Sequence, residues 1–396
     1  LLGWVSARRG AALVAQHTGA GNDRRAGIAA GQTFLLLCLL GASLALPLVV
    51  FAPRVLRMAQ VPASVLPGAS AFLRIVLAGI PLIAFSMGYA AALRAMGNTT
   101  IVLVVGLVTN VINLALDPLL IFGVGFFPEL GVKGAAMATV FSRLINALIC
   151  AWGLWKGWAG LRLCVSDFLP NRDIIRKTIS VGLPAAIGNS SNAVGFAAFQ
   201  VMINSLGASV MGGMVIGIRV VQFFNIPAHS MALAAAPVVG QALGAEKREL
   251  ARRAVGASAR LVAGTMLLPM LILVSQGYHV AEVFTEDPEV IREATRFFRV
   301  VPASSYCFGV LMVLLAAFYG SGHTRPAMIV HIVRLWVFRL PLAYFMGFML
   351  GMGSLGVYLG MVGGNVLAAL ITYMLFRMGG WESAVAETDL QDSEPP

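Results

Sequence analysis

Long apolar runs, separated by short polar stretches, dominate the 396-residue chain. A helix needs about 20 predominantly apolar residues to cross a bilayer, whereas strands of a membrane barrel give alternating segments of about 10 residues. The pattern therefore predicts an all-α integral membrane protein. Several runs are longer than one crossing requires, so we expect tilt or bends at Pro and Gly. Ten runs predict complete transmembrane helices: residues 31–53, 68–96, 100–124, 132–155, 178–205, 209–240, 254–281, 294–320, 327–350 and 355–377.

The opening segment, residues 1–16, is shorter, carries Arg8 and Arg9, and starts without Met. It lacks the charged start, apolar core and cleavage site of a signal peptide, so we expect the chain to begin part-way through a helix. The longest polar interval, residues 156–178, divides the chain into two helical halves. The expected organisation is an amino-terminal lobe (1–160), a cytoplasmic linker (161–177), a carboxy-terminal lobe (178–378) and a polar cytoplasmic tail (379–396).

The composition also indicates that lipid is the main solvent. Apolar residues make up 59% of the chain and charged residues 11%, against roughly 45–50% and about 25% in soluble domains. The formal charge of +11 does not indicate nucleic acid, because Lys and Arg cluster in short loops. Fourteen lie in one set of alternating loops and five in the other, which assigns the first set, and the tail, to the cytoplasm. We expect a multi-pass protein of the bacterial inner membrane.

Residues that carry chemistry are few. The four cysteines, Cys38, Cys150, Cys164 and Cys307, are scattered without a Cys-x-x-Cys pair, which favours buried apolar roles over a disulfide or a metal site. No Gly-x-x-x-x-Gly-Lys-Ser/Thr loop is present for ATP. An intramembrane enzyme would need paired acids, a His-rich metal set or a nucleophile with a base. We therefore expect no enzyme, no metal and no cofactor.

The chain contains an internal repeat at one constant offset, the interval that separates Gln16 from Gln241. The match holds without a gap from Gln16 to Val132, which chance apolar similarity would not do. It pairs Gln16 with Gln241, Gly19 with Gly244, Phe72 with Phe297, Arg74 with Arg299, Gly97 with Gly322, Thr99 with Thr324, and Leu130-Gly131-Val132 with Leu355-Gly356-Val357. Equivalent loops fall on the same side, so the repeat is parallel, with an axis along the membrane normal.

The second copy contains six helices, and the first has four complete ones and a partial one. We expect the first helix of that copy, and most of its second, to be missing before Leu1. The plan is therefore two parallel six-helix lobes, of which this chain holds about ten complete helices. Such lobes suit alternating access by a secondary transporter driven by an ion gradient.

Several segments resemble the multidrug and toxic compound extrusion (MATE) transporters. They are Val14-Ala15-Gln16 with Gly19-Ala20-Gly21, Val238-Val239-Gly240-Gln241 with Gly244-Ala245, Leu93 to Thr99, Asn113 to Gly123, Gly131 to Thr139, and Arg339 to Tyr344. The similarity covers essentially the whole chain. It implies twelve helices in two lobes and cation-coupled export of organic, often cationic, compounds.

The resemblance is to the DinF-like branch of that family. That branch implies a coupling site built from an Asn and an Asp one turn apart, matched here by Asn113 and Asp117, with Thr139 as the candidate threonine on the next helix. The partner acid on the family's first helix has no counterpart in this chain. Another branch uses acids on helices that correspond to residues 178–205 and 294–320, which hold no Asp or Glu.

Among the 17 acidic residues only Asp117 lies deep in an expected span. A charge there needs a partner or a wet cavity, and Asn113 lies one turn earlier on the same helix face. The functional interpretation is that Asp117 exchanges a proton or a sodium ion against substrate. The structural alternatives are a pair with Arg143 or a cap at a helix break before Pro118.

Weaker candidates lie elsewhere. Gln200, Asn192, Met202 and Arg219 are candidates for the substrate cavity, although interhelical hydrogen bonds and packing explain the same residues. Arg334 and Arg339 can pair within a lobe or contact substrate. His331 fits packing better than a proton relay. Gln16, Gly19, Gln241 and Gly244 are expected at cytoplasmic helix ends, as structural or gating elements.

The leading functional hypothesis is a secondary multidrug exporter that exchanges a cation for small organic substrates and works as a monomer. The alternative is a flippase for lipid-linked saccharides of the same wider superfamily, which predicts a large cationic cavity. The partners expected are the bilayer and small organic compounds, without nucleic acid. Because the missing first helix would form a wall of the coupling site, we expect a chain that begins at Leu1 to be inactive.

Overall fold

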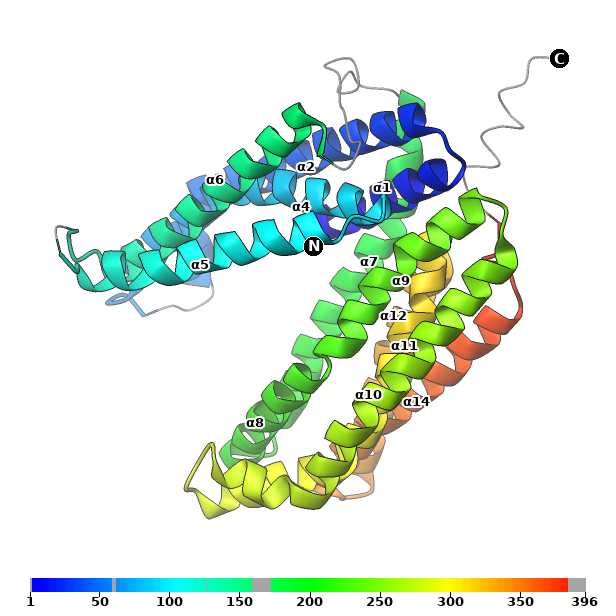
Figure 1. The fold of residues 1–396 in the computed structure, drawn as a ribbon. Coiled ribbons are helices and arrows are strands. Elements are labelled where there is room, and N and C mark those ends of the chain that lie inside the picture. Colours follow the sequence, from blue (N-terminus) through cyan, green and yellow to red (C-terminus); the bar gives the residue numbers. More distant parts are fainter. Residues whose placement is uncertain (1, 59–61, 126, 159–171, 384–396) are drawn as a thin grey trace. The chain divides into compact units, whose positions relative to one another are not determined.

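A computed structural model of the chain describes residues 2–58, 62–125, 127–158 and 172–383 (Figure 1). Within these ranges the ordered elements are helices joined by short turns, without a strand. The prediction of an all-α membrane protein is therefore confirmed. Contacts divide the chain into two compact units, Leu2–Ser180 and Val181–Pro396, and Figure 1 shows the helices of each unit running side by side.

The amino-terminal unit is built from six helices: α1 (Leu2–Gly19), α2 (Asp23–Met58), α3 (Leu66–Ala78), α4 (Ile80–Ala95), α5 (Thr100–Phe122) and α6 (Val132–Lys156). Helix α2 packs against α1, α3 and α4, and α6 packs against α3 and α5. A buried apolar cluster that includes Phe34, Tyr89 and Leu93 joins α2 to α4.

The carboxy-terminal unit contains α7 (Arg172–Asn204), α8 (Ala208–Phe224), α9 (Ile226–Gly244), α10 (Arg248–Glu282), α11 (Pro288–Ser321), α12 (Thr324–Ile332), the π-helix η3 (Val333–Arg339), α13 (Leu340–Tyr344), the π-helix η4 (Phe345–Met349) and α14 (Gly353–Arg377). Helix α11 is the central element, packed against α8, α9, α10 and α14. Its buried Phe297 meets Tyr358 of α14 with ring centroids 5.2 Å apart.

Eight helices of the described ranges are long and apolar enough to cross a membrane, or up to nine if a bent pair counts as one span. That pair, α3 and α4, corresponds to the predicted run 68–96 and bends by 41° at Gly79, just before Pro81. The predicted run 209–240 is likewise broken into α8 and α9 at Asn225, before Pro227. Both breaks lie where proline removes a backbone donor.

The internal repeat is present in three dimensions. Shifting the bounds of α1 and α2 by the repeat offset gives α9 and α10 to within one residue, and the α3–α4 pair maps onto α11. The turns that follow α1 and α9 are also alike. Gly21 (φ 71°) and its equivalent Glu246 (φ 58°) are both left-handed. Each turn is closed by matching hydrogen bonds, such as Asn22 N–H to His17 O (2.9 Å) and Lys247 N–H to Ala242 O (2.8 Å).

The linker and the tail are the two polar segments that the sequence predicts outside the lobes. Most of the linker, residues 161–171, lies outside the described residues, and 172–177 are already helical in α7. The start of the tail is packed: Trp381 is fully buried, donates to Phe376 O (3.0 Å) and stacks on the Phe376 ring. Glu382 pairs with Arg252 of α10 at 2.6 Å. The remaining tail residues, 384–396, lie outside the described residues.

Candidate functional site

Asp117 is half-buried near the carboxy-terminal end of α5. Within the described ranges its carboxylate has no ion pair and no hydrogen bond, although Arg143 is described on the neighbouring α6. Helix α5 continues through Pro118 to Phe122 without a break. The pair with Arg143 and the capped break, the two structural alternatives for Asp117, are therefore not what the structure shows.

Asn113 lies one turn before Asp117 on α5. Its side-chain Nδ2 is buried and has no hydrogen-bond partner among the described residues. The expected hydrogen bond from this amide to the Asp117 carboxylate is thus absent. A buried amide without a partner keeps an unmet desolvation cost, of about 1–3 kcal/mol. The two groups are consequently both available to a ligand.

Thr139 of α6 donates its hydroxyl to Ala135 O (2.9 Å), within its own helix. Two contacts fix the level at which α5 and α6 pass each other in the antiparallel pair. Gly134 packs against the backbone of Leu120, and Asn146 Nδ2 donates to Thr109 Oγ1 at 2.7 Å. Thr139 lies between these two contacts along α6, so it lies beside the turn of α5 that contains Asp117. No hydrogen bond joins the side chains of Thr139 and Asp117 in the described structure.

The α5–α6 interface also contains a buried polar chain that the sequence analysis did not identify. Thr109 Oγ1 accepts from Asn146 and donates to Val105 O (2.7 Å), while the Cys150 thiol donates to Asn146 Oδ1 (3.4 Å). All three side chains are buried. The available signal was a polar residue in the middle of each of two adjacent apolar runs, which is typical of interhelical hydrogen bonds.

A second buried polar network lies in the carboxy-terminal unit. Arg334 of η3 donates from Nη1 to Asn365 Oδ1 (3.0 Å) and from Nη2 to Asn192 Oδ1 (2.6 Å). Asn365 Nδ2 in turn donates to Ser304 Oγ of α11 (3.2 Å). Asn192, which was predicted to line a cavity, therefore links α7 to η3 through this hydrogen bond. The guanidinium of Arg334 also lies 4.9 Å from the ring centroid of Phe308.

Arg339, five residues after Arg334, is equally buried, at 5% exposure. Its guanidinium lies 4.4 Å from the ring centroid of Phe199 and 5.8 Å from that of Phe196, both on α7. Its Nε and Nη2 have no hydrogen-bond partner among the described residues. The sequence alone did not indicate that these two arginines share one interior.

The other predicted cavity residues are dispersed. Gln200 Nε2 contacts Met211 Sδ at 2.8 Å, and Met202 packs against the apolar core of its unit. Arg219 is exposed on α8 and makes no hydrogen bond or ion pair within the described ranges. His331 lies 3.2 Å from the Tyr319 hydroxyl, which agrees with a packing role.

The four motif residues lie at equivalent helix ends. Helix α1 ends at Gly19 and α9 at Gly244. Gln16 is fully buried and its backbone oxygen accepts from Ala20 N–H (2.9 Å), as that of Gln241 does from Ala245 N–H (3.0 Å). The four residues thus lie at helix ends, and their structural or gating role stays a prediction.

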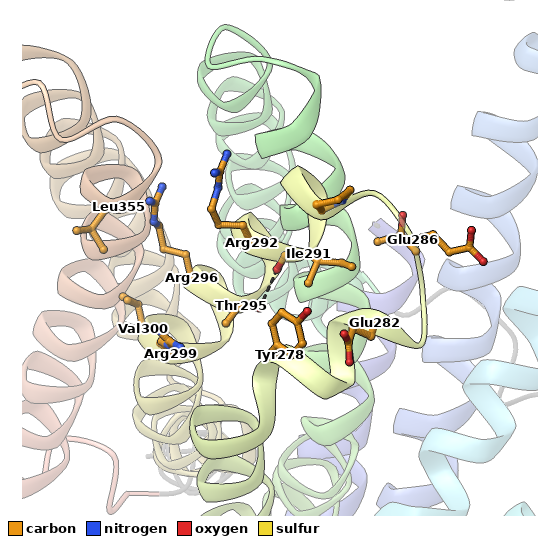
Figure 2. A pocket seen from close by; sticks show the side chains of 12 residues that line it. Tyr278, Glu282, Glu286, Ile291, Arg292, Thr295, Arg296, Arg299, Val300 and Leu355 are labelled. Carbon is orange, nitrogen blue, oxygen red and sulfur yellow. Dashed lines mark hydrogen bonds between the residues drawn. The ribbon is translucent and has the colours of Figure 1, made fainter.

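A pocket of about 850 Å³ lies where α10 passes into α11, and Leu355 at the start of α14 completes it. Figure 2 shows Tyr278 and Glu282 on the α10 side, opposite Arg296 and Arg299 of α11. Arg296 is already engaged by Glu293 (2.6 Å) and Ser354 (2.8 Å). None of the residues predicted as coupling or substrate ligands lines this pocket. Among the described residues, no group of three or more His, Cys, Asp or Glu side chains could hold a metal ion.

Known proteins resemble this chain along most of its length. A multidrug resistance protein of Thermotoga maritima, described as probable NorM, is 28% identical over 81% of this chain and 69% of its own length. An FAD transporter of Shewanella oneidensis is 27% identical over 90% of this chain and 77% of its own length. A crystal structure of MATE in the bent conformation shares the fold, with a TM-score of 0.89 and 24% identity over 95% of this chain and 83% of that one.

The MatE family profile matches residues 10–119 and 184–345, more than half of the chain. The matched ranges include most of α5, with Asn113 and Asp117, and η3 with both buried arginines. The resemblance inferred from the sequence is thus confirmed at the level of the family. The chain belongs to the MatE family, the multidrug and toxic compound extrusion transporters.

Proposed function

We propose that the protein is a secondary exporter that moves small organic compounds outward in exchange for a proton or a sodium ion, with Asp117 as the coupling residue. The observation that carries the proposal is the unpaired Asp117 carboxylate in an apolar helix, one turn from the unbonded amide of Asn113. The assignment to the DinF-like branch is part of the same proposal.

The Asp117 carboxylate carries a negative charge within a membrane helix when it is ionised. An ionised Asp in a membrane helix costs at most about 2.5–3.5 kcal/mol on insertion scales, the value at the helix centre, and such residues pair or mark ion pathways. No described side chain supplies the pair. A bound proton or sodium ion would neutralise the carboxylate, and the Asn113 amide oxygen and the Thr139 hydroxyl lie at the right level to assist. Release of that ion would restore the charge and complete a cycle.

The parallel repeat supports the same conclusion, since repeats of this kind place the transported solutes near the middle of the membrane. Two of the relatives are described as a probable multidrug resistance protein and an FAD transporter, so small organic compounds are the proposed substrates. No observation favours a lipid-linked saccharide. A monomer in the inner membrane, with a cytoplasmic carboxy terminus, stays part of the proposal.

The test is transport by the full-length protein in proteoliposomes with an imposed proton or sodium gradient and ethidium as the reporter. The variant is Asp117→Asn, which keeps size and removes the charge. Glu129→Gln makes the same chemical change at an exposed acid outside the spans of the same unit. We expect gradient-driven efflux to fall to background in the first variant only.

Two outcomes decide the proposal. Undiminished efflux by Asp117→Asn would overturn the coupling role. Equal loss in Glu129→Gln would mean that the loss does not depend on Asp117. Applying the proton and sodium gradients separately then identifies the coupling ion, because only the gradient of that ion drives efflux in the wild type.

A further inference from the structure

The carboxy-terminal unit encloses two positive charges. Arg334 and Arg339 are each 5% exposed and lie within the apolar span Thr324–Met349. Arginine is not deprotonated in proteins, so both guanidinium groups stay charged. Buried charges are normally paired or bound to ligands. The pair therefore calls for a negative partner.

The described helices of this unit supply no such partner. Residues 174–245, 254–281 and 294–381, which form nearly all the helices of the unit, contain no Asp or Glu. The described acids of the unit lie in turns or near helix ends, and the buried one, Glu293, is paired with Arg296. Among the described residues, neither Arg334 nor Arg339 takes part in an ion pair. The two charges are balanced only by neutral groups.

Several N–H donors of the two guanidinium groups have no acceptor among the neutral groups around them. Asn192 and Asn365 accept two N–H groups of Arg334, but its Nε has no acceptor. In Arg339 both Nε and Nη2 are without an acceptor. These two nitrogens form one edge of the planar guanidinium, the fork that binds both oxygens of a carboxylate or phosphate. The rings of Phe196 and Phe199 lie against this group, and no described acceptor occupies that edge.

The π-helix η3 brings the two arginines together. Its backbone pairs residue i with residue i+5, so residues five apart lie closer to one face of the helix than they would in an α-helix. Arg334 and Arg339 have this spacing. The guanidinium of Arg339 lies over the rings of Phe199 and Phe196, and that of Arg334 lies over the ring of Phe308. Short π-helical segments are frequent at functional sites.

We propose that Arg334 and Arg339 form a binding site for an organic anion, in which a carboxylate or phosphate group takes the free edge of Arg339 and Nε of Arg334. The aromatic rings of Phe196 and Phe199 would contact an apolar or aromatic body attached to that group. The inference rests on the proposed transport function only in taking this anion to be a substrate. An anionic ligand differs from the cationic substrates that the family resemblance implies.

The test is binding without any gradient, measured by equilibrium dialysis with the full-length protein in phosphatidylcholine nanodiscs. The probes are flavin mononucleotide and riboflavin, which share one ring system and differ by a phosphate group. We expect the phosphate-bearing probe to bind at least about tenfold more tightly, since a bidentate charge-assisted contact is among the stronger hydrogen bonds. Equal affinity of the wild-type protein for the two probes would by itself overturn the proposal.

Variants then locate the site. Arg339→Gln should remove the preference for phosphate, and Arg339→Lys should retain part of it, because lysine keeps the charge and loses the fork. The matched control is Arg377→Gln, an exposed arginine that lies over Tyr373 on α14 and should bind as the wild type does. A preference that survives in Arg339→Gln would place the phosphate elsewhere and overturn the assignment. Folding is checked by the melting temperature of each variant.

Two further measurements distinguish a lipid headgroup from a soluble substrate and separate failure of the anion site from failure of the proposed transport function. Adding phosphatidylglycerol to the nanodiscs should leave flavin mononucleotide binding unchanged; displacement would show that a lipid headgroup occupies the site and would overturn its assignment to a soluble substrate. Asp117→Asn should retain binding of the phosphate probe while losing ethidium efflux. Binding without any efflux in the wild type would overturn the proposed transport function and leave the anion site standing.

Discussion

Arg334 of η3 and Asn192 of α7 share a hydrogen bond of 2.6 Å across 142 residues of sequence. The same guanidinium reaches Asn365 of α14, so one side chain joins three helices of the carboxy-terminal unit. Hydrogen bonds to charged groups contribute about 1.5–3 kcal/mol each, more than neutral ones. This junction is thus a main polar support of that unit's interior.

Removing the Asn192 amide should destabilise the unit. We expect Asn192→Ala to lower the free energy of unfolding by about 1.5–3 kcal/mol, because a buried N–H of a charged group loses its acceptor. Asn204→Ala, at an exposed position of the same helix, is the control and should have little effect. Thermal unfolding in detergent measures both. Equal melting temperatures for the two variants would contradict the prediction.

Asn192→Asp should be more stable than Asn192→Ala. A carboxylate at this position would pair with Arg334 and supply the negative charge that the unit lacks. We expect higher thermal stability than in Asn192→Ala, together with loss of the preference for flavin mononucleotide over riboflavin. Retained preference in this variant would count against the anion site.

The Asn146–Thr109 bond should stabilise the amino-terminal unit. Asn146→Leu leaves Thr109 without its donor and should cost about 1–3 kcal/mol, whereas Asn146→Leu with Thr109→Val should cost less than the sum of the two single changes. A double-mutant cycle of unfolding free energies measures the coupling. Strict additivity would show that this hydrogen bond contributes nothing.

The left-handed turn residue after α9 offers a change that should increase stability. Glu246→Gly should raise the free energy of unfolding by up to about 1 kcal/mol, since a side chain in this conformation is strained and the repeat-equivalent residue is Gly21. Gly21→Ala should lower it by about 1–2 kcal/mol for the same reason. Glu249→Gly, three residues on and inside α10, is the control and should destabilise by about 1 kcal/mol.

Burial rather than charge should anchor the start of the tail. Trp381→Ala removes a fully buried ring and should cost about 3–5 kcal/mol. Glu382→Gln breaks the 2.6 Å pair with Arg252, whose side chain is 53% exposed, and should cost no more than about 1 kcal/mol. Trp155→Ala, at a ring that is 79% exposed, controls for loss of an indole. The melting temperatures of the three variants test this prediction. A larger loss of stability in Glu382→Gln than in Trp381→Ala would contradict it.

The spans, the repeat and the family could be predicted from the sequence because each depends on local or periodic information. A run of apolar residues longer than the bilayer core must be helical wherever it lies. The constant repeat offset likewise predicted which helices correspond, as the pairs Gln16 with Gln241 and Gly19 with Gly244 show at the ends of α1 and α9. Asp117 was identifiable because acids are scarce in apolar runs.

The contacts within the site depended on tertiary structure. The sequence indicated that Asp117 needs a partner, but only the folded α5–α6 pair shows that Arg143 is not that partner. It also left Asn192 and Arg334 as separate candidates in different runs, because rotation and depth of each helix are set by packing against its neighbours. The switch to π-helix in η3 has no local sequence signal that distinguishes it from α-helix. The sequence by itself therefore determined a two-lobe helical membrane transporter with one interior acid. The tertiary structure decided that this acid is unpaired in α5, and that two arginines meet without an acid in the other lobe, since helix packing alone brings distant side chains together.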